Sequence, residues 1–449
     1  MKANPRLVTA CEVALRRSIR WGLLLVAFVA CGARSGLIGD DSSILGYGGS
    51  SSGSGSGSSS SGSSSGSGGS GSSSGGSSSG GSGGGSGGSS AQRYPTQISA
   101  GNKFTCAVMS DGIVECWGSN ENGRLGDDAF LLSFTPREVT NISSAVAVSA
   151  GARHACALLR DDTVACWGDN SGGQLGDKLW DSSNVPLKVA DITTADAVAA
   201  GVEHTCVAAD NFDSIYCFGN NSEGQSGADA GIYLTNIPTK VAALHSNVVG
   251  LGAGRSHTCV ISLSNPGPVA CWGSNRRYQL GQSDLTDSNS PVLAGNIKNA
   301  AALAVGDQHN CALIGGTAAG TVQCWGWGYY GQLGTGSTQD SYVANNVFGI
   351  TSAIAVTAAN QSCALLSDGT VKCWGFNNGG ELGDGTTVSK STPVFVRGLS
   401  NVKQITAGAL HTCALLNDNS VKCWGENGYG QLGNGTSNGS LVPTPVVGL

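Results

Sequence analysis

Residues 150–176 read AGARHACALLRDDTVACWGDNSGGQLG. The same pattern, with two cysteines around a turn, then Trp-Gly, then a Gln-Leu-Gly ending, recurs seven times between residues 94 and 449. Successive copies of the first cysteine are 50 to 53 residues apart. Self-similarity at this period predicts one supersecondary unit per copy, stacked into a repeat architecture.

Each copy predicts a β-hairpin. In the first copy, two apolar runs flank the turn signal Ser110-Asp111-Gly112. A three-residue loop with Gly112 in the left-handed conformation places Cys106 directly opposite Cys116. Opposed Cα atoms lie about 4.5–5.5 Å apart, within the disulfide reach of roughly 4.4–6.8 Å. We therefore predict seven disulfides: Cys106–Cys116, Cys156–Cys166, Cys206–Cys217, Cys259–Cys271, Cys311–Cys324, Cys363–Cys373 and Cys413–Cys423.

Zinc binding is the alternative use of these cysteines. A histidine lies two residues before the first cysteine in five copies, so the histidine and the cysteine share one strand face. A single hairpin without a Cys-x-x-Cys knuckle is poor zinc spacing, and we expect neither a metal nor a cofactor. Catalytic histidines do not recur with a repeat, so we interpret these as packing and hydrogen-bonding residues: His154, His204, His257, His309 and His411.

The repeat resembles that of the regulator of chromosome condensation family, whose copies of about 50 residues each form one blade of a seven-bladed β-propeller. The resemblance includes the endings Gln174-Leu175-Gly176, Gln332-Leu333-Gly334 and Gln431-Leu432-Gly433, and departs from them at Gln225-Ser226-Gly227. It implies an all-β ring. The segment Pro443–Leu449 looks like the piece that the first copy lacks. We expect this C-terminal strand to complete the blade begun by residues 97–117 and so to close the ring.

The N-terminal segment predicts export. Residues 1–30 combine a basic start with an apolar run that is too short to span a bilayer, as in a signal peptide. The residues before Cys31 resemble a bacterial lipoprotein signal, which implies lipid on Cys31 and a membrane-anchored protein; an ordinary signal peptide and free secretion are the alternative. Residues 31–47 then form the mature N-terminal segment. Residues 48–90 contain only Gly and Ser and predict a disordered tether.

Charge narrows the possible partners of residues 91–449. Without residues 1–30 the chain has 19 basic and 29 acidic residues. Nucleic-acid binders attract phosphate with basic residues, so we expect no nucleic-acid partner. Export also means an oxidising compartment, in which paired cysteines persist as disulfides.

The loops that follow Trp-Gly vary in sequence while their frame is fixed, so all seven should emerge on one side of the ring. Tyr, Trp and Arg are enriched at interface hot spots, and such residues gather in the loops of copies four to seven. The candidate partner face comprises Arg276, Arg277, Tyr278, Trp327, Tyr329, Tyr330, Phe376 and Tyr429. The alternative is that these aromatic residues fold back over the core. We expect Phe130, Phe134 and Trp180 to serve ordinary packing.

These observations favour a monomeric, non-enzymatic binding or scaffold propeller that holds an unknown protein partner at the cell envelope. Other classes stay open. The family resemblance weakly implies a regulator like the nuclear exchange factor for a small GTPase. Some propellers are hydrolases or lyases, although the sequence has no H-E-x-x-H motif and its clearest departures from repeat symmetry are aromatic. A purely structural surface protein is the third alternative.

Overall fold

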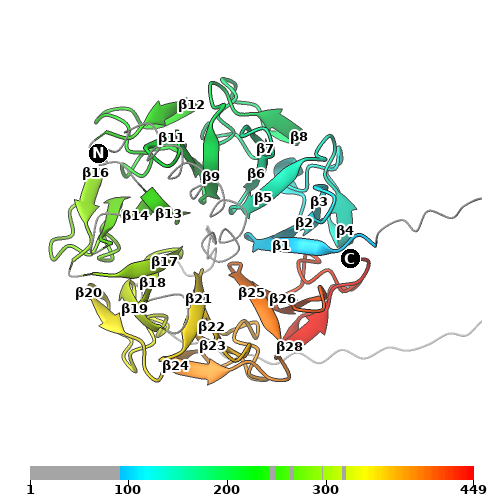
Figure 1. The fold of residues 1–449 in the computed structure, drawn as a ribbon, viewed down its shortest axis with the longest axis vertical. Helices are drawn as coiled ribbons and strands as arrows, with labels where there is room; N and C mark the ends of the chain where they lie inside the picture. The colour runs from blue at the N-terminus through cyan, green and yellow to red at the C-terminus, as the bar shows by residue number, and fades with distance from the viewer. Residues whose placement is uncertain (1–91, 243–247, 263–266, 296, 316–319) are drawn as a thin grey trace, which may run out of the picture. The chain divides into compact units, whose positions relative to one another are not determined.

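The computed structural model describes residues 92–242, 248–262, 267–295, 297–315 and 320–449. Within them the chain forms seven four-stranded antiparallel sheets, arranged as the blades of a ring (Figure 1). This confirms the all-β seven-bladed propeller. The predicted signal peptide, Cys31, residues 31–47 and the Gly/Ser tether lie outside the described residues.

Each blade consists of four strands that are consecutive in the chain. Blades one and two are β1 (Pro95–Ala100), β2 (Phe104–Met109), β3 (Val114–Gly118), β4 (Ser133–Glu138), and β5 (Ala145–Ala150), β6 (His154–Leu159), β7 (Val164–Gly168), β8 (Ser183–Lys188). Blades three and four are β9 (Ala195–Ala200), β10 (His204–Ala209), β11 (Ser214–Asn220), β12 (Leu234–Lys240), and β13 (Val248–Ala253), β14 (His257–Ser262), β15 (Val269–Gly273), β16 (Ser288–Leu293). Blades five and six are β17 (Ala300–Val305), β18 (His309–Ile314), β19 (Thr321–Gly326), β20 (Ser341–Asn346), and β21 (Ala353–Ala358), β22 (Gln361–Leu366), β23 (Val371–Gly375), β24 (Lys390–Phe395). Blade seven is β25 (Val402–Ala407), β26 (His411–Leu416), β27 (Val421–Gly425), β28 (Ser440–Pro445), and a 3-10 turn, η1 (Glu121–Gly123), follows β3.

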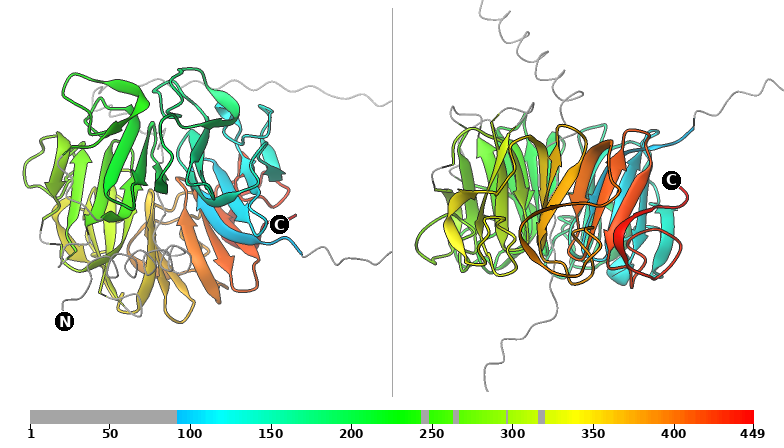
Figure 2. Two further views of the ribbon diagram at one scale, coloured as in Figure 1. Left: turned by 45° about the horizontal axis from the view of Figure 1, so that its top comes forward. Right: turned by 90° about the horizontal axis from the view of Figure 1, so that it is seen from below.

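The first strand of every blade faces the ring axis and the fourth strand lies at the rim (Figure 1). Because neighbouring strands are antiparallel, the turn after the first strand and the long loop after the third strand emerge at the same end of the ring. We call this end the loop face. The hairpin turns between second and third strands and the connections between blades emerge at the opposite end, as the edge-on view illustrates (Figure 2).

The predicted closure of the ring by the C-terminal strand is wrong. Strand β28 pairs with β27 in its own blade, with Cys423 opposite Thr444. The blade begun by residues 97–117 is completed by β4, which contains Thr135 and Pro136. The Pro-containing segment is therefore the last strand of the blade that precedes it, and the ring closes by packing of β1 against β25 and β26.

The hairpins confirm the predicted register and all seven disulfides. Cys106 lies opposite Cys116, and Gly112 has a φ of 89° in the three-residue turn. Asp162 and Asn419 adopt the same left-handed conformation at the equivalent turn positions. The bridged Cα atoms are 4.0–4.1 Å apart, slightly closer than expected, and every bridged cysteine is fully buried. Seven such bridges indicate an extracellular or otherwise oxidising environment.

The repeated histidines join neighbouring blades. Nε2 of His154 lies 2.7 Å from the Thr205 hydroxyl of blade three. That hydroxyl donates to the backbone carbonyl of Gln174 at 2.8 Å, so its proton is committed and the imidazole Nε2–H must be the donor. Asn310 leads to the same conclusion, because its side-chain oxygen can only accept from His257 Nε2, at 2.9 Å. The histidines therefore carry a proton on Nε2, and burial lowers their pKa to about 3 or 4, which disfavours a second proton on Nδ1.

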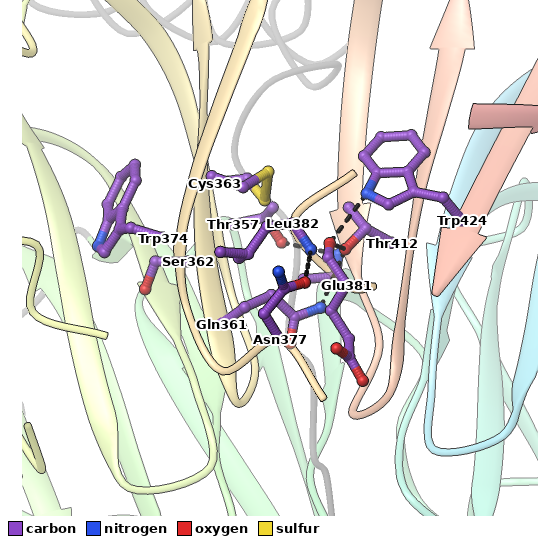
Figure 3. Close-up of a disulfide and its surroundings, with 12 residues drawn as sticks. Thr357, Gln361, Ser362, Cys363, Trp374, Asn377, Glu381, Leu382, Thr412 and Trp424 are labelled. Atoms are coloured by element: carbon purple, nitrogen blue, oxygen red, sulfur yellow. Dashed lines mark hydrogen bonds between the residues drawn. A yellow bond between two sulfur atoms is a disulfide. The ribbon is translucent and has the colours of Figure 1, made fainter. Parts of the chain in front are cut away.

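Departures from this pattern keep the two partners matched. In blade one Phe104 replaces the histidine, and blade two presents Ala155 instead of a hydroxyl; both belong to one apolar cluster. In blade six Gln361 replaces the histidine and donates its amide to the Thr412 hydroxyl at 3.0 Å (Figure 3). Each junction thus keeps a matched pair, either apolar with apolar or donor with acceptor.

Candidate binding face

The long loop of each blade is held against the next blade. In blade six the carbonyl of Glu381 accepts hydrogen bonds from Trp424 Nε1 and the Thr412 hydroxyl of blade seven, both at 2.9 Å (Figure 3). The same loop reaches the neighbouring rim strand, where the Gly385 N–H donates to the Leu441 carbonyl at 3.0 Å. These contacts fix the base of each loop and leave its tip free to vary.

An asparagine three residues after the buried tryptophan braces most of these loops, and sequence reasoning assigned it no role. In blade six the Asn377 side-chain oxygen accepts from the Leu382 N–H at 2.9 Å (Figure 3). Its amide group donates to the carbonyls of Thr386 and Val388. The recurring Trp-Gly-x-Asn in the repeat was the available signal. In blade five Gly328 takes this position, and its N–H donates to Asp340 at 2.9 Å.

Glycine is required at position 328 because the Gln339 carbonyl oxygen occupies the place that a β-carbon would need. The loop of blade five therefore departs from the common frame at the point where its aromatic residues begin. Trp327 precedes Gly328, and Tyr329 and Tyr330 follow it.

The aromatic side chains of blades five and six form one contiguous group. Ring centroids of Trp327 and Tyr329 are 6.2 Å apart with nearly parallel planes. Tyr330 stands edge-on to Trp327 at 5.3 Å and to Tyr329 at 5.0 Å. It also contacts Phe376 of blade six at 4.9 Å. We call Trp327, Tyr329, Tyr330 and Phe376 the aromatic cluster.

The aromatic cluster is only partly covered. The Tyr329 side chain is 63% exposed, whereas the other three rings are half-buried. Burial and the neighbouring Tyr329 raise the pKa of the Tyr330 hydroxyl above its usual value. The sequence predicts either an exposed partner face or aromatic residues that fold back over the core. Three rings fold partly back, whereas Tyr329 faces solvent.

The remaining candidate residues lie on the loop face but contact other groups. Tyr278 packs against Tyr342 of β20 at 5.9 Å. Arg276 pairs with Glu223 at 2.6 Å, and Arg277 pairs with Asp340 at 3.5 Å. Ring contacts therefore join four of the eight candidates.

Tyr429 in blade seven holds the ammonium of Lys103, 4.3 Å from its ring centroid.

Exposed aromatic residues also occur in the loops of blades one and two. Phe130 and Trp180 are 66% and 49% exposed, so the expectation that they serve ordinary packing is wrong. Phe134 is half-buried.

Two buried carboxyl groups lie at the loop face, Glu381 in the long loop of blade six and Asp307 in the turn after the first strand of blade five. Glu381 replaces the glutamine found in most blades, and burial, with a further contribution from Glu426, raises its pKa to about 8. Burial likewise raises the pKa of Asp307 to about 6, against the opposing effect of Arg255. Among the described residues, no group of three or more His, Cys, Asp or Glu is arranged to hold a metal ion. The sulfurs that zinc would need are bonded to each other.

Comparison with known families and structures supports this architecture. Two models of the regulator of chromosome condensation repeat match this chain. One matches residues 96–124, 145–174, 195–225 and 402–431. The other matches residues 111–158, 161–208, 267–313, 368–415 and 418–449. Together they cover more than half of the chain.

Similar proteins are known in several organisms. The mouse probable E3 ubiquitin-protein ligase HERC4 is 30% identical over 156 residues, which are 34% of this chain and 14% of the ligase. An Arabidopsis thaliana mitochondrial protein with the same domain, RUG3, is 28% identical over 30% of each chain. The chain thus spans only a minor part of the length of these relatives.

Solved structures show the same fold. Prp20p from Saccharomyces cerevisiae superposes with a TM-score of 0.65 at 21% identity, covering 76% of this chain and 87% of its own. Human WBSCR16 gives a TM-score of 0.67 at 22% identity, covering 75% and 94%. At these identities the likeness establishes the propeller architecture.

Proposed function

The chain belongs to the regulator of chromosome condensation repeat family, and from that premise we propose that it is a non-enzymatic propeller that binds a protein partner through the aromatic cluster on its loop face. One observation carries the proposal: four aromatic side chains from two neighbouring blades contact each other on the loop face. Aromatic residues of this kind dominate the energetics of protein interfaces.

The setting of the propeller is part of the proposal. The buried disulfides favour an oxidising compartment, and residues 1–30 read as an export signal. We propose that lipid on Cys31 anchors the chain to a membrane and that residues 48–90 act as a tether that sets the reach of the propeller. In the described part of the chain, no helix is long and apolar enough to cross a membrane.

The competing functions receive less support. The solved structure of Prp20p is reported with its binding to Gsp1p and histones, and a chain with seven buried disulfides is poorly suited to a reducing nuclear compartment. An enzyme would need a nucleophile or acid-base pair. Residues 435–439 read Gly-Thr-Ser-Asn-Gly, as in a nucleophile elbow, but β28 follows them where that motif requires a helix.

Site-specific photocrosslinking in the source cells tests the proposal. A photoreactive phenylalanine analogue replaces Tyr329 in the whole chain, and in a matched control it replaces Tyr233, a 66% exposed tyrosine of the blade-three loop. We expect a discrete crosslinked protein from position 329 only. The same crosslinked products from both positions, or no product from either, would overturn the proposal.

A substitution experiment complements the crosslink. The Trp327→Ser, Tyr329→Ser, Tyr330→Ser variant should lose capture of the crosslinked protein, and Trp180→Ser in the loop of blade two should keep it. Both variants must retain all seven disulfides, which mass spectrometry of unreduced peptides verifies.

A further inference from the structure

Tyr330 and Tyr429 occupy the same position in two different blades. The backbone N–H of Tyr330 donates to the Gln332 side-chain oxygen at 2.9 Å, and that of Tyr429 donates to Gln431 in the same way at 3.0 Å. Their surroundings differ, however: the Tyr429 ring contacts Lys103 in the turn after the first strand of blade one, whereas the Tyr330 ring contacts Phe376 of blade six. The two tyrosines therefore form an internal comparison.

Tyr429 already holds a cation. Lys103, in the first turn of blade one, places Nζ 4.3 Å from the Tyr429 ring centroid and 3.3 Å from its hydroxyl. This distance lies within the range of about 6 Å in which an ammonium is attracted to an aromatic face. A tyrosine at this position of the loop face is thus suited to a cationic partner.

The corresponding turn in blade six is one residue shorter. Its Ala359 N–H bonds the carbonyl of Gln361, two residues on, whereas the Gly101 N–H in blade one bonds the carbonyl of Phe104, three residues on. Ala358-Ala359-Asn360-Gln361 aligns with Ala100-Gly101-Asn102-Phe104, so blade six has no residue at the position of Lys103. Asn360, the counterpart of Asn102, is buried and donates to the Ala409 carbonyl. Blade six therefore supplies no counterpart of the Lys103 ammonium at Tyr330, whose ring contacts Phe376 instead.

Carboxylates flank the aromatic cluster. Asp340 is held by the Gly328 N–H and pairs with Arg277. On the other side, exposed Glu426 follows Trp-Gly as Phe376 does one blade earlier, and its side chain lies against Gly379. The chain as a whole has a formal net charge of −6. An aromatic surface in an acidic setting is complementary to a cation.

From these observations we infer that the aromatic cluster receives an arginine or lysine side chain from a basic segment of the protein partner, in the way that Tyr429 receives Lys103. The inference rests on the proposed function and specifies the chemistry of the partner. The partner's cation lies over the aromatic rings near Tyr330, and Glu426 supplies the nearby negative charge.

Peptide binding tests this inference directly. The probe is a fluorescein-labelled peptide, Gly-Ser-Arg-Gly-Ser-Arg-Gly-Ser, and its matched control carries citrulline, the neutral isostere, at both arginine positions. Fluorescence anisotropy with the whole chain is measured at about 0.15 M salt, where exposed charges are screened beyond about 8 Å. We expect the arginine peptide to bind at least about fivefold more tightly than the citrulline peptide.

Variants locate the site. Tyr330→Leu with Phe376→Leu keeps apolar volume but removes two aromatic faces, and it should abolish the arginine preference. Tyr429→Leu removes an equivalent ring that is already occupied by Lys103, and it should leave the preference intact. Unreduced peptide mapping and thermal unfolding establish that both variants are folded.

The outcomes separate this inference from the proposed function. Equal binding of the two peptides, or an arginine preference that persists in Tyr330→Leu/Phe376→Leu, overturns the inference even if the photocrosslink at position 329 succeeds. An arginine preference without any crosslinked protein supports cation binding by the aromatic cluster but overturns the protein partner, and with it the proposed function. Stronger binding to neutral oligosaccharide than to the arginine peptide would also overturn the inference that the aromatic cluster receives a cation.

Discussion

His411 in the last blade donates a hydrogen bond to the Thr105 hydroxyl of the first blade, with Nε2 and Oγ1 2.7 Å apart. The Thr105 hydroxyl in turn donates to the Gln431 carbonyl at 3.0 Å. The junction between the last and the first blade is therefore built like the junctions between blades that follow one another in sequence.

This pair predicts a coupled effect of substitution. Thr105→Ala should leave the His411 Nε2–H without an acceptor in a buried site and lower the free energy of unfolding by about 1–3 kcal/mol. The double variant Thr105→Ala/His411→Phe reproduces the Phe104 and Ala155 pair and should recover part of that loss. Urea unfolding of oxidised protein measures Thr105→Ala, the single variant His411→Phe and the double variant. Strictly additive losses would show that the two residues are not coupled.

The buried histidines predict acid sensitivity. Burial lowers the pKa of His154 and His257 to about 4 and that of His204, His309 and His411 to about 3. Above the unfolded value of about 6.5 their stabilisation is fully present. As the pH falls from 6.5 toward 4 and 3, the unfolded chain binds protons that the folded chain excludes, so stability is lost.

The size of the acid effect can be measured in one variant. Each histidine should contribute a loss on the order of 1–2 kcal/mol at pH 5. His309→Gln copies the amide that Gln361 uses in blade six and should reduce the fall in unfolding free energy between pH 7 and pH 5. An unchanged pH dependence would mean that His309 titrates alike in both states.

Glu381 predicts a loss of stability as the pH rises, whereas the histidines predict one as the pH falls. Its pKa is raised by burial from 4.5 to about 8, so the folded state holds the proton that the unfolded state releases. Stability from this residue is fully present below pH 4.5 and falls as the pH rises through 8. Glu381→Gln restores the amide of the other blades and should increase the unfolding free energy at pH 8.5 by more than about 1 kcal/mol. Equal gains at pH 5 and pH 8.5 would contradict this account.

The disulfides predict that removing the bridge of any one blade lowers the free energy of unfolding by a similar amount. Sequence separations range only from 10 to 13 residues, and loop entropy changes slowly with length. Removing the Cys363–Cys373 pair by double alanine substitution should lower the free energy of unfolding by about 3 kcal/mol. Removing the Cys311–Cys324 pair should cost nearly the same. Chemical unfolding under non-reducing conditions measures both.

Local pairing could be predicted from the sequence because each hairpin contains its own constraints. The turn around Asp111 fixes the register, and the register places Cys106 opposite Cys116 without reference to any other blade. The phase of the repeat could not be predicted in the same way. A cyclic pattern has no inherent starting point, so the Pro-containing strand β4 reads equally well as the end of one blade or the beginning of the next.

The candidate face was predictable only as a set of loops. Fixed framing residues place the variable loops on one end of the ring, but contacts between loops depend on their individual conformations. Gly328 breaks the asparagine bracing of blade five, and the shortened turn before Gln361 removes the counterpart of Lys103. These differences decide which rings meet at Tyr330 and which, like Tyr278, turn toward the rim.

Because no strand is exchanged between the first and last blades, the same ring can form from a chain that begins at a different blade. Leu449 packs in the same apolar cluster as Ile98 and Trp117, so the C-terminus lies next to the first blade. A circular permutant that joins the two ends of the propeller and begins at another connection between blades would keep every strand pairing and every disulfide. New chain ends can thus be placed at other connections between blades without a change in the fold.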